Sequence, residues 1–151
     1  MTSALLAFLH HVAAFLIFGT LLAELVLTKA ELTLTSARSL LRMDAAYGIS
    51  AMLLIVVGLL RVVYTEKGVS YYLGSAPFIV KVSLFAVVGL LSIGPTREFL
   101  SWRTLLRQSE VPRLSDEKRR SVRRAIHIEL TLLVIIMLCA ALMARGIGFF
   151  G

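Results

Sequence analysis

The sequence predicts an all-α fold: an integral membrane four-helix bundle, with an interfacial amphipathic helix between its third and fourth helices, in a single transmembrane domain over residues 1–151. Three observations predict it. Hydrophobic residues make up 58% of the chain, and the mean hydropathy of +0.88 lies far above that of soluble globular proteins. Four apolar runs approach or reach the roughly 20 helical residues that cross a hydrocarbon core. The basic residues gather mostly in one connection, which favours membrane anchoring over a nucleic-acid partner.

The first two spans are predicted over residues 3–28 and 45–64. The first lacks the basic leader and the small-residue cleavage site of a signal peptide, so we expect it to be retained. Asp44 stands directly before the second span, where a carboxylate suits the N-cap position of a helix. Gly48 and Gly58 are small residues of the kind that let helix backbones approach closely in lipid.

The last two spans are predicted over residues 76–93 and 125–144. Pro77 suits the first turn of the third span, and Pro95 is expected to end it, because proline lacks the N–H donor that a helix interior requires. Cys139 lies within the fourth apolar run and is expected to behave there as a small apolar side chain.

The connection between the third and fourth spans, residues 96–124, is strongly basic. With four spans, both termini share one side of the membrane, and the first and third loops share the other. Most of the 16 lysines and arginines belong to these two loops. The positive-inside rule therefore places the loops in the cytoplasm and both termini in the periplasm of a bacterial inner membrane. Apolar residues among the basic ones predict the interfacial helix, and they are Phe99, Leu100, Trp102, Leu105 and Leu106.

The predicted depth of each polar residue separates two sets. The outer set, near the side of the termini, combines imidazoles, cations and a thioether: His10, His11, Arg61, Lys67, Lys81 and Met143. An imidazole inside a membrane needs a ligand, a proton or a neighbouring helix as partner. We predict that one of the two histidines ligates the iron of haem b, with Met143 available as a second axial ligand. Arg61, Lys67 or Lys81 would then pair with the haem propionates.

Adjacent helical residues point about 100° apart, so at most one of His10 and His11 faces a given site. His11 is the preferred ligand, because its helical face continues through Phe15 and Phe18, whose aromatic rings suit the lining of a macrocycle. In the alternative interpretation the histidines hydrogen-bond to a tyrosine or a backbone carbonyl, and Met143 only packs.

The inner set lies toward the other side of the membrane and has charges of both signs: Glu24, Arg42, Asp44, Arg97, His127 and Glu129. This balance predicts ion pairs and helix caps that close the inner end of the bundle. Most of the membrane separates His127 from the two histidines of the outer set, so one metal ion is not expected to join them.

Two family resemblances extend this interpretation. The segment "RSLLRMDAAYGISAMLLIVVGLLRVVYTEKGVSYYLGSAPFIVKVSLFAVVGLLSIGPTREFLSW" and the later "ELTLLVIIMLCAALMARG" resemble the bacterial predicted membrane protein family known as domain of unknown function 2214. This resemblance covers nearly the whole chain and implies a four-helix membrane protein.

More distantly, "FLHHVAAF", "LLRMDAAYG" and "PFIVKVSLF" resemble stretches of the HemJ-type protoporphyrinogen oxidases. That resemblance implies that His10 or His11 ligates haem and that Arg42 and Lys81 contribute to the site. The chain differs at three places: Asp44 stands where the oxidases have glutamate, Phe78 replaces a tryptophan, and Pro95 lies near where they continue with histidines.

Three functions from different classes follow. The first is a b-type haem protein, a homodimer that carries out electron transfer or oxidation with a quinone or porphyrin-like partner. The second is a small transporter or lipid-handling protein that binds an anionic solute at Lys81 and Arg61. The third is a structural subunit of a larger membrane complex. Whether the protein is an enzyme is left open.

Overall fold

The part of the chain that the structure describes forms four long helices and two short ones. The computed structural model describes residues 1–64 and 68–150. In chain order the helices are α1 (Thr2–Leu27), α2 (Leu34–Tyr64), α3 (Gly68–Leu73), α4 (Ala76–Ser101), α5 (Arg103–Arg107) and α6 (Asp116–Ala144). The four long helices are each long and apolar enough to span a membrane, so the predicted all-helical, four-span fold is confirmed.

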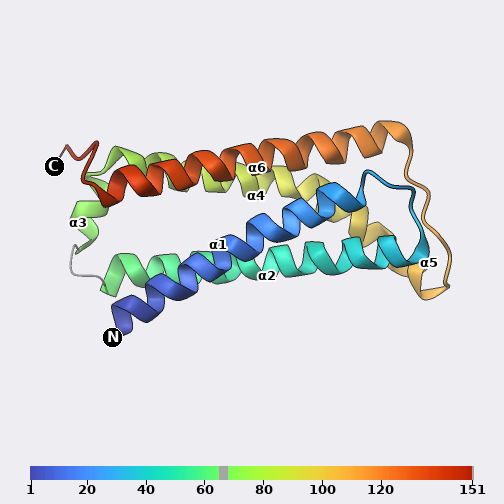
Figure 1. Ribbon diagram of the computed structural model, residues 1–151, viewed down its shortest axis with the longest axis horizontal. Coiled ribbons are helices and arrows are strands. Elements are labelled where there is room, and N and C mark those ends of the chain that lie inside the picture. Colours follow the sequence, from blue (N-terminus) through green and yellow to red (C-terminus); the bar gives the residue numbers. More distant parts are fainter. Residues whose placement is uncertain (65–67, 151) are drawn as a thin grey trace.

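The long helices pack in two pairs (Figure 1). α1 packs along α2, and α4 packs along α6, with fewer contacts between the pairs. The N-terminus, the C-terminus and α3 share one end of the bundle, which we call the terminal end, and α5 lies at the opposite end, which we call the basic end. Much of the buried core lies toward the basic end, with Leu21 of α1, Leu40 of α2, Phe99 of α4 and Ile126 of α6 in one cluster.

The second and fourth spans begin earlier in the chain than predicted, because capping residues lie upstream. The hydroxyl oxygen of Thr33 accepts a hydrogen bond from the backbone N–H of Ser36, and the backbone N–H of Thr33 donates in return to the Ser36 hydroxyl oxygen. These reciprocal hydrogen bonds cap the N-terminus of α2, which begins at Leu34. Asp44 therefore lies inside α2, and its predicted N-cap role was wrong. Ser115 caps α6 by accepting from the Lys118 backbone N–H.

The third span also extends beyond its predicted end. Pro77 lies in the first turn of α4, as predicted, but Pro95 is buried inside the helix, so the prediction that it ends the span was wrong. Proline removes one hydrogen bond from the helix ladder. Neighbouring helices and side-chain hydroxyls compensate such a loss in membrane helices, and α4 continues to Ser101.

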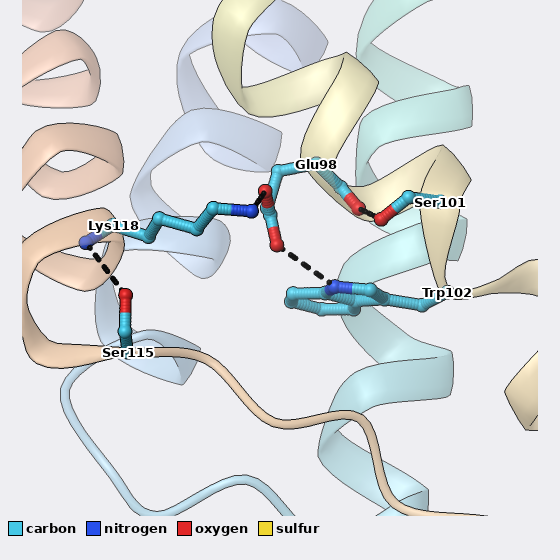
Figure 2. A network of polar contacts seen from close by, with 5 residues as sticks. All are labelled: Glu98, Ser101, Trp102, Ser115 and Lys118. Carbon is cyan, nitrogen blue, oxygen red and sulfur yellow. Dashed lines mark hydrogen bonds and ion pairs between the residues drawn. The ribbon is translucent and has the colours of Figure 1, made fainter.

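At the basic end, side-chain contacts fasten the end of α4 to the start of α6 (Figure 2). The Lys118 ammonium lies 2.8 Å from Glu98 Oε2, and the Trp102 indole N–H donates to Glu98 Oε1 at 3.2 Å. Phe99, Trp102 and Leu106 are buried in the core. The apolar residues that predicted an interfacial helix thus include three that pack within the bundle, and the interfacial placement stays a prediction.

The terminal end is closed by the C-terminal segment. The backbone N–H of Phe150 donates to the Gly74 carbonyl oxygen at 2.9 Å, and that of Ala76 donates to the Gly148 carbonyl oxygen at 3.0 Å. Gly148 has a φ of +80°, and a Cβ there would lie 2.9 Å from Cδ of Pro77, so both conformation and space require glycine. This closure holds the last turn of α6 beside the start of α4.

Candidate functional site

All four long helices and α3 contribute to one pocket toward the terminal end, which we call the outer pocket. Its volume is about 240 Å³. The polar or polarisable residues that line it are His10 of α1, Arg61 of α2, Tyr72 of α3, Lys81 of α4 and Met143 of α6. Most of the remaining lining is aliphatic or aromatic, so the pocket is an apolar space with polar groups at a few points.

His10 enters this pocket because α2 has a glycine opposite it. A Cβ at Gly58 would lie 3.3 Å from the His10 Cε1 atom and 3.6 Å from its Nδ1 atom, so the imidazole packs against the bare backbone of α2. The Nδ1 atom is buried and makes no hydrogen bond of standard length and angle among the described residues, although the imidazole interacts with the Leu54 backbone of α2. A buried ring nitrogen without such a hydrogen bond is costly, and it is available to a ligand.

The electrostatics of the outer pocket are cationic. His10 interacts electrostatically with both Arg61 and Lys81, and these two cations interact with each other. The Lys81 Nζ atom also lies 5.0 Å from the centroid of the Phe78 ring, a cation–π distance. None of the described residues lining the pocket is acidic. Among the residues that the structure describes, the lining of this apolar pocket therefore supplies no anion for its two cations.

The structure brings together His10, Arg61, Lys81 and Met143 of the predicted outer set. His11 lies elsewhere: its side chain is exposed, and its Nδ1 atom is 2.6 Å from the Ala7 carbonyl oxygen on its own helix. Phe15, which supported the preference for His11, is 77% exposed on the outside of the bundle. The geometry favours His10 as the pocket histidine, which corrects that preference. Lys67 lies outside the described residues.

A second cavity lies between α2 and α4, toward the basic end; it has a volume of about 390 Å³ and opens at the surface of the bundle, where Gly48, Ile55 and Gly89 of its lining are exposed. We call it the inner cavity. Ile55 and Phe85 line both spaces, so the two are neighbours along the same helix pair. The polar residues that line the inner cavity are Asp44, Tyr47, Ser92 and Thr96. Thr96 Oγ1 donates a hydrogen bond of 2.6 Å to the Asp44 carboxylate, which joins α4 to α2.

Three carboxylic acids near this cavity interact electrostatically with one another. We call them the inner carboxyl cluster: Glu24 of α1, Asp44 of α2 and Glu129 of α6. Glu24 is 2% exposed and Glu129 is fully buried. Neither oxygen of Glu129, nor Oε1 of Glu24, makes a hydrogen bond of standard length and angle among the described residues. The cluster is an electrostatic unit, because each acid interacts with the other two.

The predicted ion pairs of the inner set were wrong for these acids. Arg42, Arg97 and His127 are exposed. His127 places its Nδ1 atom 2.7 Å from the Arg123 carbonyl oxygen of its own helix. Among the described residues the ion pair is that of Lys118 with Glu98, and no lysine or arginine pairs with the inner carboxyl cluster. Arg42, which the HemJ-type resemblance connects to the site, does not line the outer pocket.

A family model for predicted membrane proteins matches residues 2–148. The chain belongs to the DUF2214 family of predicted membrane proteins. The match spans all four long helices, so the outer pocket and the inner cavity both lie within the family's shared region. No curated protein and no solved structure matches the chain.

Tyr47 belongs to the polar site beside the inner cavity, which the sequence did not indicate. Its ring is 6% exposed, and its hydroxyl lies beside both the Glu129 carboxyl group and the Ser92 hydroxyl. A tyrosine three residues after Asp44 shares a helical face with it, and this spacing could have indicated that both belong to one polar site.

Proposed function

We propose that the outer pocket binds an amphipathic anion from the membrane, a molecule with a carboxylate or phosphate headgroup and an apolar body. The observation that carries this proposal is the juxtaposition of Arg61 and Lys81 in an apolar pocket without an acidic lining residue among those described. An anion between them would neutralise two charges that are otherwise held close together in a low-dielectric environment.

Arg61, Lys81 and His10 would each make a different kind of contact with the headgroup. Arg61 supplies a planar fork of N–H donors that matches a carboxylate or phosphate. Lys81 supplies a compact charge, and the buried Nδ1 atom of His10 supplies either a donor or an acceptor, depending on its tautomer. The apolar body would lie along Leu54, Val82 and Phe85 between α2 and α4, toward the inner cavity.

A displacement experiment tests this function. The protein, purified in a non-ionic maltoside, is loaded with a fluorescent long-chain fatty acid, and three competitors of equal chain length are added: a fatty acid, an alkyl phosphate and a fatty alcohol. We expect the two anions to displace the probe and the alcohol to fail. Equal displacement by all three would mean that only the apolar chain is recognised, and the proposal would be wrong.

Haem b is a second candidate ligand, because an imidazole and a thioether from facing helices, His10 and Met143, line the same pocket as two cations. The donor types fit a haem with its propionates. The space does not, since at about 240 Å³ the pocket is below the roughly 300–1,000 Å³ of typical ligand sites; a rigid macrocycle would exceed it, whereas a flexible chain can extend past Ile55 and Phe85 toward the inner cavity. For this reason the amphipathic anion ranks first. Electron transfer with a quinone or porphyrin-like partner stays a prediction that depends on haem being bound.

A visible absorption spectrum separates the two candidates. The purified protein, expressed with ample haem, is measured oxidised and then reduced with dithionite. A featureless spectrum is expected for the amphipathic-anion function. A Soret band with sharp reduced bands would establish a six-coordinate haem and replace the first candidate.

We also propose that the basic end faces the cytoplasm of a bacterial inner membrane, because most lysines and arginines lie in the helix ends and connections at that end. The outer pocket would then open near the periplasmic side. Accessibility of single cysteines introduced at Lys29 and Leu73 to a membrane-impermeant thiol reagent tests this orientation. The homodimer stays a prediction.

A further inference from the structure

We propose that the inner carboxyl cluster is a proton-binding site that exchanges protons with water through the inner cavity. This site lies toward the other end of the bundle from the outer pocket, and its occupation by a proton does not require the amphipathic anion to be bound. It is formed by side chains that the sequence assigned to structural ion pairs.

The buried oxygens of Glu129 point to the proton. Glu129 is fully buried, and neither of its carboxyl oxygens makes a hydrogen bond of standard length and angle among the described residues, although the Tyr47 hydroxyl lies beside the carboxyl group. Glu24 is 2% exposed, and its Oε1 atom makes no such hydrogen bond. Three ionised carboxylates cannot share a low-dielectric interior without a compensating charge. Protons remove the charge and supply O–H donors to these oxygens.

The groups that face the cluster offer no other compensation. α1 contributes Glu24, α2 contributes Asp44 and Tyr47, and α6 contributes Glu129. From α4 come the uncharged hydroxyls of Ser92 and Thr96, which line the inner cavity beside Asp44. From α5, Arg103 interacts with Asp44, but its side chain is exposed and forms no ion pair with it.

A metal ion is a poorer occupant than the proton. Among the described residues, no group of three or more His, Cys, Asp or Glu side chains is arranged to hold a metal ion. A proton binds to a single oxygen, and neighbouring acids can share it. It therefore does not require Glu24, Asp44 and Glu129 to converge on one point, as a metal ion would.

The inner cavity supplies the route. It has a volume of about 390 Å³, and the polar side chains in its lining, among them Ser92 and Thr96, offer hydrogen bonds to water beside them. Asp44 and Tyr47 line this cavity directly. The Tyr47 hydroxyl also lies beside Glu129, which connects the cavity to the deepest acid. Asp44 thus takes up a proton directly from cavity water. Glu129 takes up a proton from the Tyr47 hydroxyl, which is reprotonated by cavity water. Release to water follows the same steps in reverse.

Infrared spectroscopy tests the proton. The protein is reconstituted in phosphatidylcholine vesicles, and the carbonyl stretch of protonated carboxylic acids is recorded at neutral pH in H₂O and in D₂O. We expect a band that shifts on deuteration, and we expect Glu129→Gln and Glu24→Gln each to lose part of it. Glu98→Gln is the matched control, because Glu98 is ion-paired with Lys118, and it should leave the band unchanged.

The wild-type spectrum alone can overturn the proposal, whether or not the variants fold. The absence of a protonated-carboxyl band at neutral pH would do so. A band that survives unchanged in both Glu129→Gln and Glu24→Gln would also do so.

The route has its own test. A Cβ at Gly89 or at Gly19 would meet no atom within 4 Å, but only Gly89 lines the inner cavity. Gly89→Leu should therefore fill the cavity and slow the deuteration of the carboxyl band, while Gly19→Leu should leave the rate at its wild-type value. Equal rates in the two variants would mean that protons do not enter through the inner cavity.

Discussion

Removing the charge of Lys81 should weaken binding of an amphipathic anion to the outer pocket. Lys81→Met keeps a long unbranched side chain, so the lining of the pocket changes little apart from the charge. A hydrogen bond to a charged group contributes about 1.5–3 kcal/mol. Since 1.4 kcal/mol corresponds to a factor of ten, the dissociation constant for a long-chain fatty acid should rise roughly 10- to 100-fold.

The lost cation–π contact with Phe78 acts on a different quantity. Lys81 makes this contact without any ligand, at 5.0 Å from the ring centroid. Its loss should remove about 0.5–1 kcal/mol of stabilisation, which the relief of repulsion between Lys81 and Arg61 opposes, and should leave the affinity almost unaffected. Thermal unfolding in the same maltoside separates this effect from binding.

Direct titration with the fluorescent fatty acid is the assay. Lys29→Met is the matched control, because Lys29 is an exposed lysine at the opposite end of the bundle. It should bind as the wild type does. A dissociation constant for Lys81→Met equal to that of Lys29→Met would show that the anionic headgroup does not contact Lys81.

Three further outcomes are expected. Gly58→Val should displace the His10 ring, because the added Cβ would lie 3.3 Å from its Cε1 atom, and fatty-acid titration should show weaker binding. If haem is bound, His10→Ala should lose the Soret band and His11→Ala should keep it; the reverse result would restore His11 as the ligand. Glu98→Ala should lower the free energy of unfolding by about 1–3 kcal/mol, because it leaves the buried Trp102 indole N–H without its acceptor. Glu98→Gln, which keeps an acceptor, should cost less in the same denaturation experiment.

The sequence was enough to predict four spans and the grouping of the outer pocket. Hydropathy alone identifies helices of this length, and the depth of a residue within a span follows from helical rise. The predicted depths in the membrane are similar for four residues, and the structure places all four in one pocket: His10, Arg61, Lys81 and Met143.

Helix rotation and helix ends could not be obtained in the same way. The choice between His10 and His11 depends on which face of α1 meets α2, and that is set by the close approach at Gly58. The end of the third span depends on neighbours that compensate Pro95, which a rule about proline in isolated helices does not include.

The inner carboxyl cluster was also beyond the sequence. Balanced charges at one depth suggested ion pairs, yet Arg42 and Arg97 have exposed side chains while Glu24 and Glu129 are buried. Long basic side chains reach water or headgroups easily, so equal depth does not ensure that opposite charges meet.

Photocrosslinking tests the central claim, anion binding in the outer pocket, most directly. A long-chain fatty acid with a photoreactive group near its carboxylate is bound to the protein, irradiated and mapped by peptide mass spectrometry. Labelling at Leu54–Val62 of α2 and Phe78–Phe85 of α4, abolished by excess fatty acid and not by fatty alcohol, is the expected result. Labelling confined to outward residues such as Phe15 and Leu90, or competition by the alcohol as strong as by the acid, would contradict it.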